Sequence, residues 1–137
     1  MPRYQLDTNM VIYLMKNQPE EVAWRFAQCQ VGDVGMSAIT YAELAYGVAV
    51  SVAPTREGQK LASLVEDIPV FAFDRAAGNA YGPIRLSTRD SKKDHLNKLI
   101  AAQAVALGAV LVTNNERDFT RYPGVITENW LDVKRET

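Results

Sequence analysis

Apolar residues along this chain form short continuous runs that alternate with stretches of helical spacing. The runs at 68–73 and 109–113 contain almost no polar residue, which is typical of strands covered on both faces. Weaker runs predict three further strands, and residues 96–107 have the clearest helical spacing of the chain. The predicted strands are 4–6, 34–37, 68–73, 109–113 and 125–127, and the predicted helices follow residues 7–9, 53–56 and 74 or cover 20–30, 40–46 and 96–107.

Two of these boundaries are marked by a residue with a local structural role. Asp74 precedes a helical stretch and predicts an N-cap, because its carboxylate accepts a hydrogen bond from a free backbone N–H. Gly108 follows the helix at 96–107 and predicts a C-cap, because glycine adopts the left-handed conformation without strain. Each boundary lies beside one of the two most hydrophobic strands.

The alternation of strands and helices predicts the fold class. Strands separated by helices pair in parallel through right-handed crossovers, so we expect an α/β protein with three α/β/α layers around a central, mostly parallel sheet. The chain has no linker or repeat, and its 137 residues predict a single domain over 1–137. In such sheets ligands bind beyond the carboxyl ends of the strands, where Asp7 and Asn115 are expected to lie.

Composition excludes several classes of chemistry. The chain has 15 basic and 16 acidic residues and a net charge of −1, so it has no general attraction for nucleic acid or anionic membranes. The single cysteine, Cys29, excludes an internal disulfide and a cysteine cluster for zinc. The single histidine, His95, argues against catalytic triads and histidine-rich metal sites. Any chemistry must therefore be carried by carboxylates.

Nothing in the sequence predicts export or membrane insertion. The apolar run at 10–15 is far too short to span a bilayer, and polar residues interrupt its approach. No small-residue cleavage site follows it. We therefore expect a cytoplasmic protein with no membrane partner.

Four polar positions could form a metal site at the sheet edge: Asp7, Glu43, Asn97 and Asn115. Clustered carboxylates repel one another unless a cation lies between them. Mg²⁺ prefers oxygen ligands and keeps coordination sites for water and phosphate, and a metal held in this way can activate a water. Such a site needs neither histidine nor cysteine.

Each position also has an ordinary structural interpretation. Asp7 precedes a helix and could be its N-cap. The segment 40–43 has the spacing of a capping box, in which Glu43 would reach back to a backbone N–H. Asp94 and Asn97 fit the first turn of a helix, and Asn115 fits a turn. Taken singly, each motif is weak.

Together and in order, the motifs are far more specific. The segments are Leu6–Asn9, Ser37–Leu44, Lys98–Ala102, Leu111–Asn115, Asp118–Phe119 and Tyr122–Gly124. A chain with these motifs resembles PIN-domain proteins, and closely resembles the VapC toxins of bacterial VapBC toxin–antitoxin pairs. The resemblance covers residues 4 to about 130.

The resemblance implies a ribonuclease toxin that is active with a metal ion. It implies an endoribonuclease dependent on Mg²⁺ or Mn²⁺, an RNA substrate that is often a tRNA, a VapB-type antitoxin partner and a homodimer. Asp7 and Glu43 match the first two family acids, and Asn97 stands at the position of the third. Thr113 matches a supporting hydroxyl residue, Asn115 lies at the variable fourth position, and Asp118 could help through water.

Asn97 is the departure from the family pattern. An amide keeps the shape of aspartate but removes its charge, so a native Asn97 predicts a weakened or inactive nuclease. If Asn97 replaces an aspartate, the chain is a disarmed toxin, and we favour this interpretation because the rest of the site looks intact. Asp94 lies one helical turn earlier and could compensate, although it stands about 4.5 Å further back along the axis.

Basic residues precede the helix that carries Asn97. The segment 85–98 has a net charge of +3, which could steer a phosphate backbone to the site or could simply be a solvated surface. The candidate RNA-binding residues are Arg85, Arg89, Lys92, Lys93 and Lys98. Apolar residues at 10–15 and 45–52 suggest a groove for the antitoxin.

Two alternatives remain open on the sequence. A non-catalytic PIN-like module would bind antitoxin or RNA, with a native Asn97 as its signature. A receiver-type phosphorelay domain would need adjacent acids after the first strand and an acceptor aspartate after the middle strand. Only Asp7 fits the first requirement, and no residue fits the second convincingly.

Overall fold

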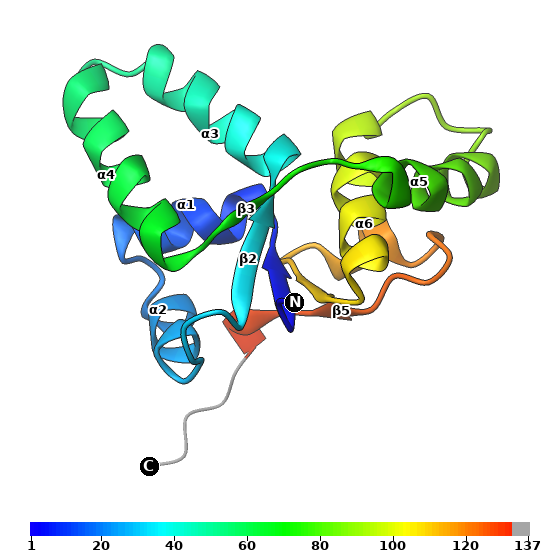
Figure 1. Ribbon diagram of the computed structural model, residues 1–137, viewed down its shortest axis with the longest axis horizontal. Helices are drawn as coiled ribbons and strands as arrows, with labels where there is room; N and C mark the ends of the chain where they lie inside the picture. Colours follow the sequence, from blue (N-terminus) through cyan, green and yellow to red (C-terminus); the bar gives the residue numbers. More distant parts are fainter. Residues whose placement is uncertain (133–137) are drawn as a thin grey trace.

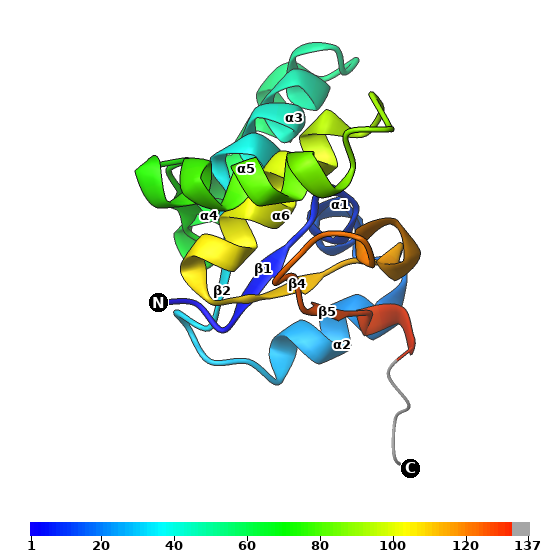
Figure 2. The ribbon, with the colours of Figure 1, turned by 90° about the vertical axis from the view of Figure 1, so that its right-hand side faces the viewer.

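A five-stranded parallel sheet runs through the middle of the protein, with helices on both faces (Figures 1 and 2). This computed structural model describes residues 1–132. The sheet order is β3-β2-β1-β4-β5, and every pairing is parallel, so the expected mostly parallel sheet is entirely parallel in the described residues. The strands are β1 (Tyr4–Leu6), β2 (Val34–Ser37), β3 (Val70–Phe71), β4 (Val110–Val112) and β5 (Thr127–Glu128).

The helices form the two outer layers. Helices α5 and α6 lie over one face of the sheet and α1 and α2 over the other, while α3 and α4 form a hairpin beside α1 (Figures 1 and 2). The three-layer α/β/α prediction is confirmed. The helices are α1 (Thr8–Lys16), α2 (Glu20–Ala27), α3 (Ala38–Ala49), α4 (Pro54–Asp67), α5 (Arg75–Ser87) and α6 (His95–Leu107), with 3₁₀ turns η1 (Glu116–Phe119) and η2 (Trp130–Asp132). The single-domain prediction over 1–137 includes residues 133–137, which lie outside the described residues.

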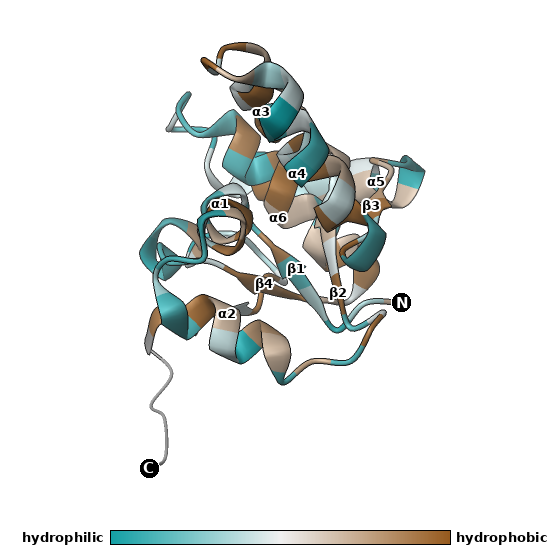
Figure 3. Cartoon of the chain, turned by 90° about the vertical axis from the view of Figure 1, so that its left-hand side faces the viewer, coloured by the Kyte–Doolittle hydropathy of each residue, from teal (hydrophilic) through white to brown (hydrophobic). Residues whose placement is uncertain are grey.

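The alternation of side chains along the strands divides the core in two. Leu6 and Val112 face the cluster under α1 and α2, whereas Leu111 faces α6. The polar exception on the inner strand is Gln5, which is fully buried and donates from Nε2 to the carbonyl oxygen of Ile100 in α6 at 2.9 Å. In Figure 3 the hydrophobic colour runs along β4, while α4 alternates between hydrophobic and hydrophilic residues as an amphipathic surface helix does.

The predicted strand at 68–73 forms only in part, and the prediction that it is covered on both faces is wrong. Only Val70 and Phe71 pair, and β3 is the edge strand of the sheet, with Val70 37% exposed. The Phe71 ring packs so closely over β2 that a Cβ on Gly35 would lie 2.5 Å from a ring carbon. The hydrophobic run therefore reflects packing of the edge against β2 rather than burial on both faces.

The other predicted boundaries agree better with the structure. The Asp74 carboxylate accepts a hydrogen bond from the Ala77 N–H at 3.0 Å, and Gly108 ends α6 with φ of 65°. Both predicted caps are confirmed. Among residues 1–132, no helix is both long and apolar enough to cross a membrane.

Candidate active site

The site begins where β1 and β4 end side by side. Leu6 pairs with Val112, and the Asp7 N–H donates to the Val112 carbonyl oxygen at 3.0 Å. Asp7 and Thr113 are therefore the first residues beyond two adjacent carboxyl ends. The strand pairing thus brings together two residues that are 106 positions apart in the sequence, at the edge where ligands bind in parallel sheets.

Asp7 combines a structural and a candidate chemical role. Its Oδ1 accepts a hydrogen bond from the Met10 N–H at 3.0 Å, so the predicted N-cap of α1 is confirmed. The carboxylate is only 9% exposed, and burial raises its pKa above the ordinary value. Hydrogen bonds from the Thr113 side chain and the Met10 N–H lower the pKa, and the negative charge of Glu43 raises it. Asp7 therefore lies in a dry position close enough to Glu43 for their charges to interact.

Glu43 is directed toward the start of α1 by a neighbouring hydroxyl. Thr8 donates from Oγ1 to Glu43 Oε1 at 2.7 Å, and its Oγ1 lies 3.4 Å from the Thr40 hydroxyl. The alternative interpretation of Glu43 as part of a capping box is wrong, because α3 begins one residue after Ser37, whose Oγ accepts from the Ile39 N–H at 3.0 Å.

Thr8 is a site residue that sequence reasoning missed. Thr8 lies inside the Leu6–Asn9 motif, but from the sequence this segment is interpreted only as the start of a helix, and Thr8 is assigned no role. Its role becomes visible only when α1 and α3 are packed together, because the hydroxyl and the carboxylate are 35 positions apart. The signal in the sequence is a hydroxyl residue directly after Asp7 together with the second hydroxyl, Thr40, on the preceding turn of α3.

Asn97 lies in the first turn of α6 and is half-buried. Asp94 precedes the helix in a left-handed conformation, with φ of 63°, and its side chain makes no capping hydrogen bond. Within residues 1–132, no three histidine, cysteine, aspartate or glutamate side chains are grouped so that they could hold a metal ion. In the described part of the chain Asp7 and Glu43 thus belong to no group of three such side chains, and the place of Asn97 in a metal site stays a prediction.

A second polar group borders the site at the end of β4. The Thr113 hydroxyl accepts from the Asn115 N–H at 3.1 Å, and the Asn115 amide donates to Asp118. The charges of Asp94 and Asp118 both raise the pKa of Tyr122, after the larger effect of its burial. Asp94 is therefore grouped with Tyr122 and Asp118, and a compensating role for it at position 97 stays a prediction.

The basic segment before Asn97 is only partly the surface that the charge pattern predicts. Arg85, Arg89, Lys92 and Lys93 are exposed, as contact with phosphate requires. Lys98 is 1% exposed and donates from Nζ to the Ser91 carbonyl oxygen at 2.9 Å. The prediction that Lys98 contacts RNA is therefore wrong, because its long aliphatic stem is buried and its ammonium is used inside the protein.

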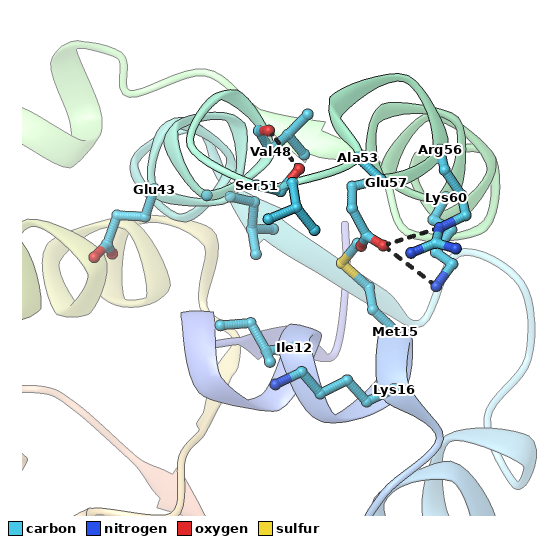
Figure 4. A pocket seen from close by; sticks show the side chains of 13 residues that line it. Ile12, Met15, Lys16, Glu43, Val48, Ser51, Ala53, Arg56, Glu57 and Lys60 are labelled. Carbon is cyan, nitrogen blue, oxygen red and sulfur yellow. Dashed lines mark hydrogen bonds and ion pairs between the residues drawn. The ribbon is translucent and has the colours of Figure 1, made fainter.

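A groove of about 490 Å³ lies between α1, α3 and α4 (Figure 4). It overlaps the apolar ranges 10–15 and 45–52, so a groove exists where the sequence predicts one. Its occupant stays a prediction. Its apolar lining includes Ile12, Met15, Leu44 and Val48, and its charged lining includes Glu43, Arg56, Glu57 and Lys60.

Comparisons with known proteins show the family to which the chain belongs. The family profile described as PIN domain matches residues 4–125. The tRNA(fMet)-specific endonuclease VapC of Shigella flexneri is 36% identical over 132 residues, which cover 95% of this chain and 99% of that protein. Ribonuclease VapC2 of Haemophilus influenzae is 35% identical over 133 residues, covering 96% of this chain and all of that protein. The crystal structure of DNA-bound VapBC from Salmonella typhimurium matches with a TM-score of 0.86 and 35% identity, covering 95% of this chain and 99% of that one. The chain therefore belongs to the PIN-domain family, among relatives that are VapC ribonucleases of toxin–antitoxin systems.

Proposed function

We propose that this protein is an endoribonuclease toxin of a toxin–antitoxin module that uses Mg²⁺ or Mn²⁺ to cleave RNA, with tRNA as the first substrate to test. The observation that carries the proposal is that Thr113 binds the Asp7 carboxylate beyond the end of β1, while Thr8, the next residue, binds Glu43 from α3. The names of the relatives support a ribonuclease, and one of those names specifies a tRNA.

The chemistry of the two carboxylates fits a hard divalent cation. Mg²⁺ is commonly held by one or two carboxylates, with waters and substrate phosphates in its other positions. Burial, and to a smaller extent the charge of Glu43, raise the pKa of Asp7 and so disfavour its ionised form, which a bound cation would stabilise. When bound, a divalent cation would supply an activated water and stabilise the charge that develops at phosphorus.

The protein's own residues would hold this arrangement in place. The Met10 N–H and the Thr113 hydroxyl fix the Asp7 carboxylate, and the Thr8 hydroxyl fixes one oxygen of Glu43. Asn97 would complete the site with a neutral amide, which lowers its negative charge and hence its affinity for metal. We therefore expect this copy to be weakened or inactive. Cleavage by water would leave 5′-phosphate and 3′-hydroxyl ends.

We propose that the groove between α1, α3 and α4 accepts a segment of a VapB-type antitoxin. Its apolar walls would bury apolar side chains of that segment, and its lining extends to Glu43 (Figure 4). A segment seated there would therefore cover one of the two carboxylates of the site. The solved VapBC complexes among the structural relatives support a partner of this kind. A homodimer stays the expectation that the family resemblance implies.

The second candidate function is a PIN-like module that binds antitoxin or RNA without cleaving. Asn97 favours it, together with the finding that residues 1–132 contain no group of three potential acidic, histidine or cysteine ligands. On this alternative the groove would still bind antitoxin and the exposed cations would still bind RNA, but Asp7 and Glu43 would have no catalytic role.

Cleavage of total tRNA separates the two functions. This chain and Asn97→Asp are incubated with Mg²⁺, Mn²⁺ or EDTA, and Asp7→Asn/Asn97→Asp is the matched control because asparagine can keep the N-cap hydrogen bond. We expect metal-dependent cleavage by Asn97→Asp that the control lacks, with 5′-phosphate ends on the products. Folded but inactive Asn97→Asp protein would favour the binding module, and 2′,3′-cyclic phosphate ends would contradict hydrolysis by water.

A further inference from the structure

The loop between α5 and α6 places cations directly before the turn that carries Asn97 (Figure 1). It covers residues 88–94, and α6 begins at the next residue. Arg89, Lys92 and Lys93 are exposed on it. Their value for binding a phosphate backbone depends on whether the loop holds them in place, because ordering a mobile loop on binding reduces affinity.

A buried lysine holds this loop from inside the protein. Lys98 is 1% exposed, although lysine is almost never fully buried unless it is paired. Its ammonium donates to the Ser91 carbonyl oxygen at 2.9 Å, in the middle of the loop, and its backbone N–H bonds to the Asp94 carbonyl oxygen at 3.0 Å. The backbone bond is the ordinary i→i−4 bond at a helix start, so the bond from the Lys98 ammonium to Ser91 is the tie between the loop and α6 that this side chain adds.

An arginine from outside α6 binds both the same loop and the last residue of α5. Arg121 donates from Nη2 to the Ser87 carbonyl oxygen at 3.1 Å and to Asp90 Oδ1 at 2.8 Å. The hydrogen bond from Arg121 also lowers the pKa of Asp90 below its ordinary value. A surface cavity of about 500 Å³ lies at this contact, and Arg89 lines it beside Arg121. The loop is thus anchored by two cations from different parts of the chain.

We infer that Lys98 is a positioning residue for RNA, which with Arg121 fixes the 88–94 loop so that Arg89, Lys92 and Lys93 contact phosphates next to Asn97. The inference rests on the proposed function, since it deepens how that site receives RNA. Lys98 does not touch RNA itself, because its ammonium is enclosed. Its effect passes through the Ser91 carbonyl to the exposed cations of the loop.

Lys98→Met tests this role, because methionine replaces the aliphatic stem but has no donor for Ser91. Lys98→Arg restores a cationic donor, and Ile100→Val is the matched control because it destabilises the same helix without touching the loop. The first measurement is limited trypsin digestion, read by mass at Arg89, Lys92 and Lys93. The second is binding of tRNA in EDTA at several salt concentrations, which requires neither metal nor cleavage.

We expect Lys98→Met to speed cleavage in the loop and to weaken tRNA binding about tenfold through lost preorganisation. The salt dependence distinguishes positioning from a direct contact. Each lost phosphate contact makes the negative slope of log K against log salt concentration shallower by about 0.7–0.9. Loss of the contacts of several loop cations should therefore make the slope shallower by more than the amount for one contact. Lys98→Arg should recover at least part of both effects, and Ile100→Val should show neither.

Equal tRNA affinity and salt slope for Lys98→Met and wild type would overturn the inference while leaving the proposed function standing. The same holds if Ile100→Val weakens binding as much as Lys98→Met does. Absence of tRNA binding by the wild-type chain would overturn the proposed RNA substrate and the inference together. In that case digestion of the loop would still report whether Lys98 anchors it.

Discussion

Replacing Thr8 by valine removes the hydroxyl that fixes Glu43 while keeping the side chain's shape and branching. The lost hydrogen bond is 2.7 Å long and ends on a carboxylate, and bonds to charged groups contribute about 1.5–3 kcal/mol when buried. Because this pair is only partly buried, water recovers part of that contribution, and we expect a loss of about 1 kcal/mol in the free energy of unfolding. For a chain of this length, that loss lowers Tm by about 3–5 °C.

Urea unfolding of Thr8→Val, Glu43→Gln and the double variant measures the interaction as a coupling free energy. Thr55→Val is the control, since Thr55 also lies in the first turn of a helix but is exposed. In the Asn97→Asp background, Thr8→Val should also weaken metal binding, because Glu43 is no longer held in one orientation. Differences below about 0.3 kcal/mol lie within the error of such comparisons. If the free energies of unfolding of Thr8→Val and Thr55→Val differ by less than this, a positioning role for Thr8 is refuted.

Three further outcomes are expected. Because the pKa of Asp7 is raised in the folded protein, its carboxyl group loses a proton at lower pH in the unfolded chain, and the free energy of unfolding without metal should fall as pH rises through the raised pKa. Thermal unfolding in EDTA from about pH 4 to about pH 7 should therefore show a decrease of Tm with pH. Asp7→Asn should reduce this decrease, and Mg²⁺ should oppose it. Gln103→Leu removes the donor to the Ala72 carbonyl oxygen and should lower the free energy of unfolding by about 1–3 kcal/mol in urea. Gly35→Ala should lower the free energy of unfolding by about 1–3 kcal/mol, because the added Cβ clashes with the Phe71 ring. Phe71→Leu in the same chain should reduce this loss, and additive effects of the two substitutions would contradict the clash.

Local patterns predict the elements well where a single residue or period decides the structure. The Asp74 and Gly108 caps depend only on neighbouring backbone groups, so they can be recognised in sequence and are confirmed. The prediction that the strand at 68–73 is covered on both faces is wrong, because hydrophobicity reports burial but not position in the sheet. An edge strand packed on Gly35 and a central strand covered on both faces can have the same composition.

The candidate site is predictable in outline but not in its contacts. That Asp7 should lie at the carboxyl edge follows from the alternation of strands and helices, because parallel strands all end at the same edge of a sheet. The bond from Thr8 to Glu43 does not follow, because it depends on how α1 and α3 pack. For Lys98 the sequence suggests a contact that the structure does not have. A count of charges along the segment treats every lysine as solvated, whereas the burial of Lys98 depends on the path of the loop that its ammonium binds.

The order of the strands also decides at which stage of synthesis the two sides of the proposed site can come together. Every residue that lines the groove lies before residue 61, whereas the site is not complete until Thr113 has been added beside Asp7. At translation rates of about 5–20 residues per second, the intervening 53 residues take roughly 3–10 s. A nascent chain thus carries the sequence of its groove before it carries both sides of the proposed site. The topology therefore delays completion of the proposed site to the last part of translation, because β4 must be made before it can pair with β1.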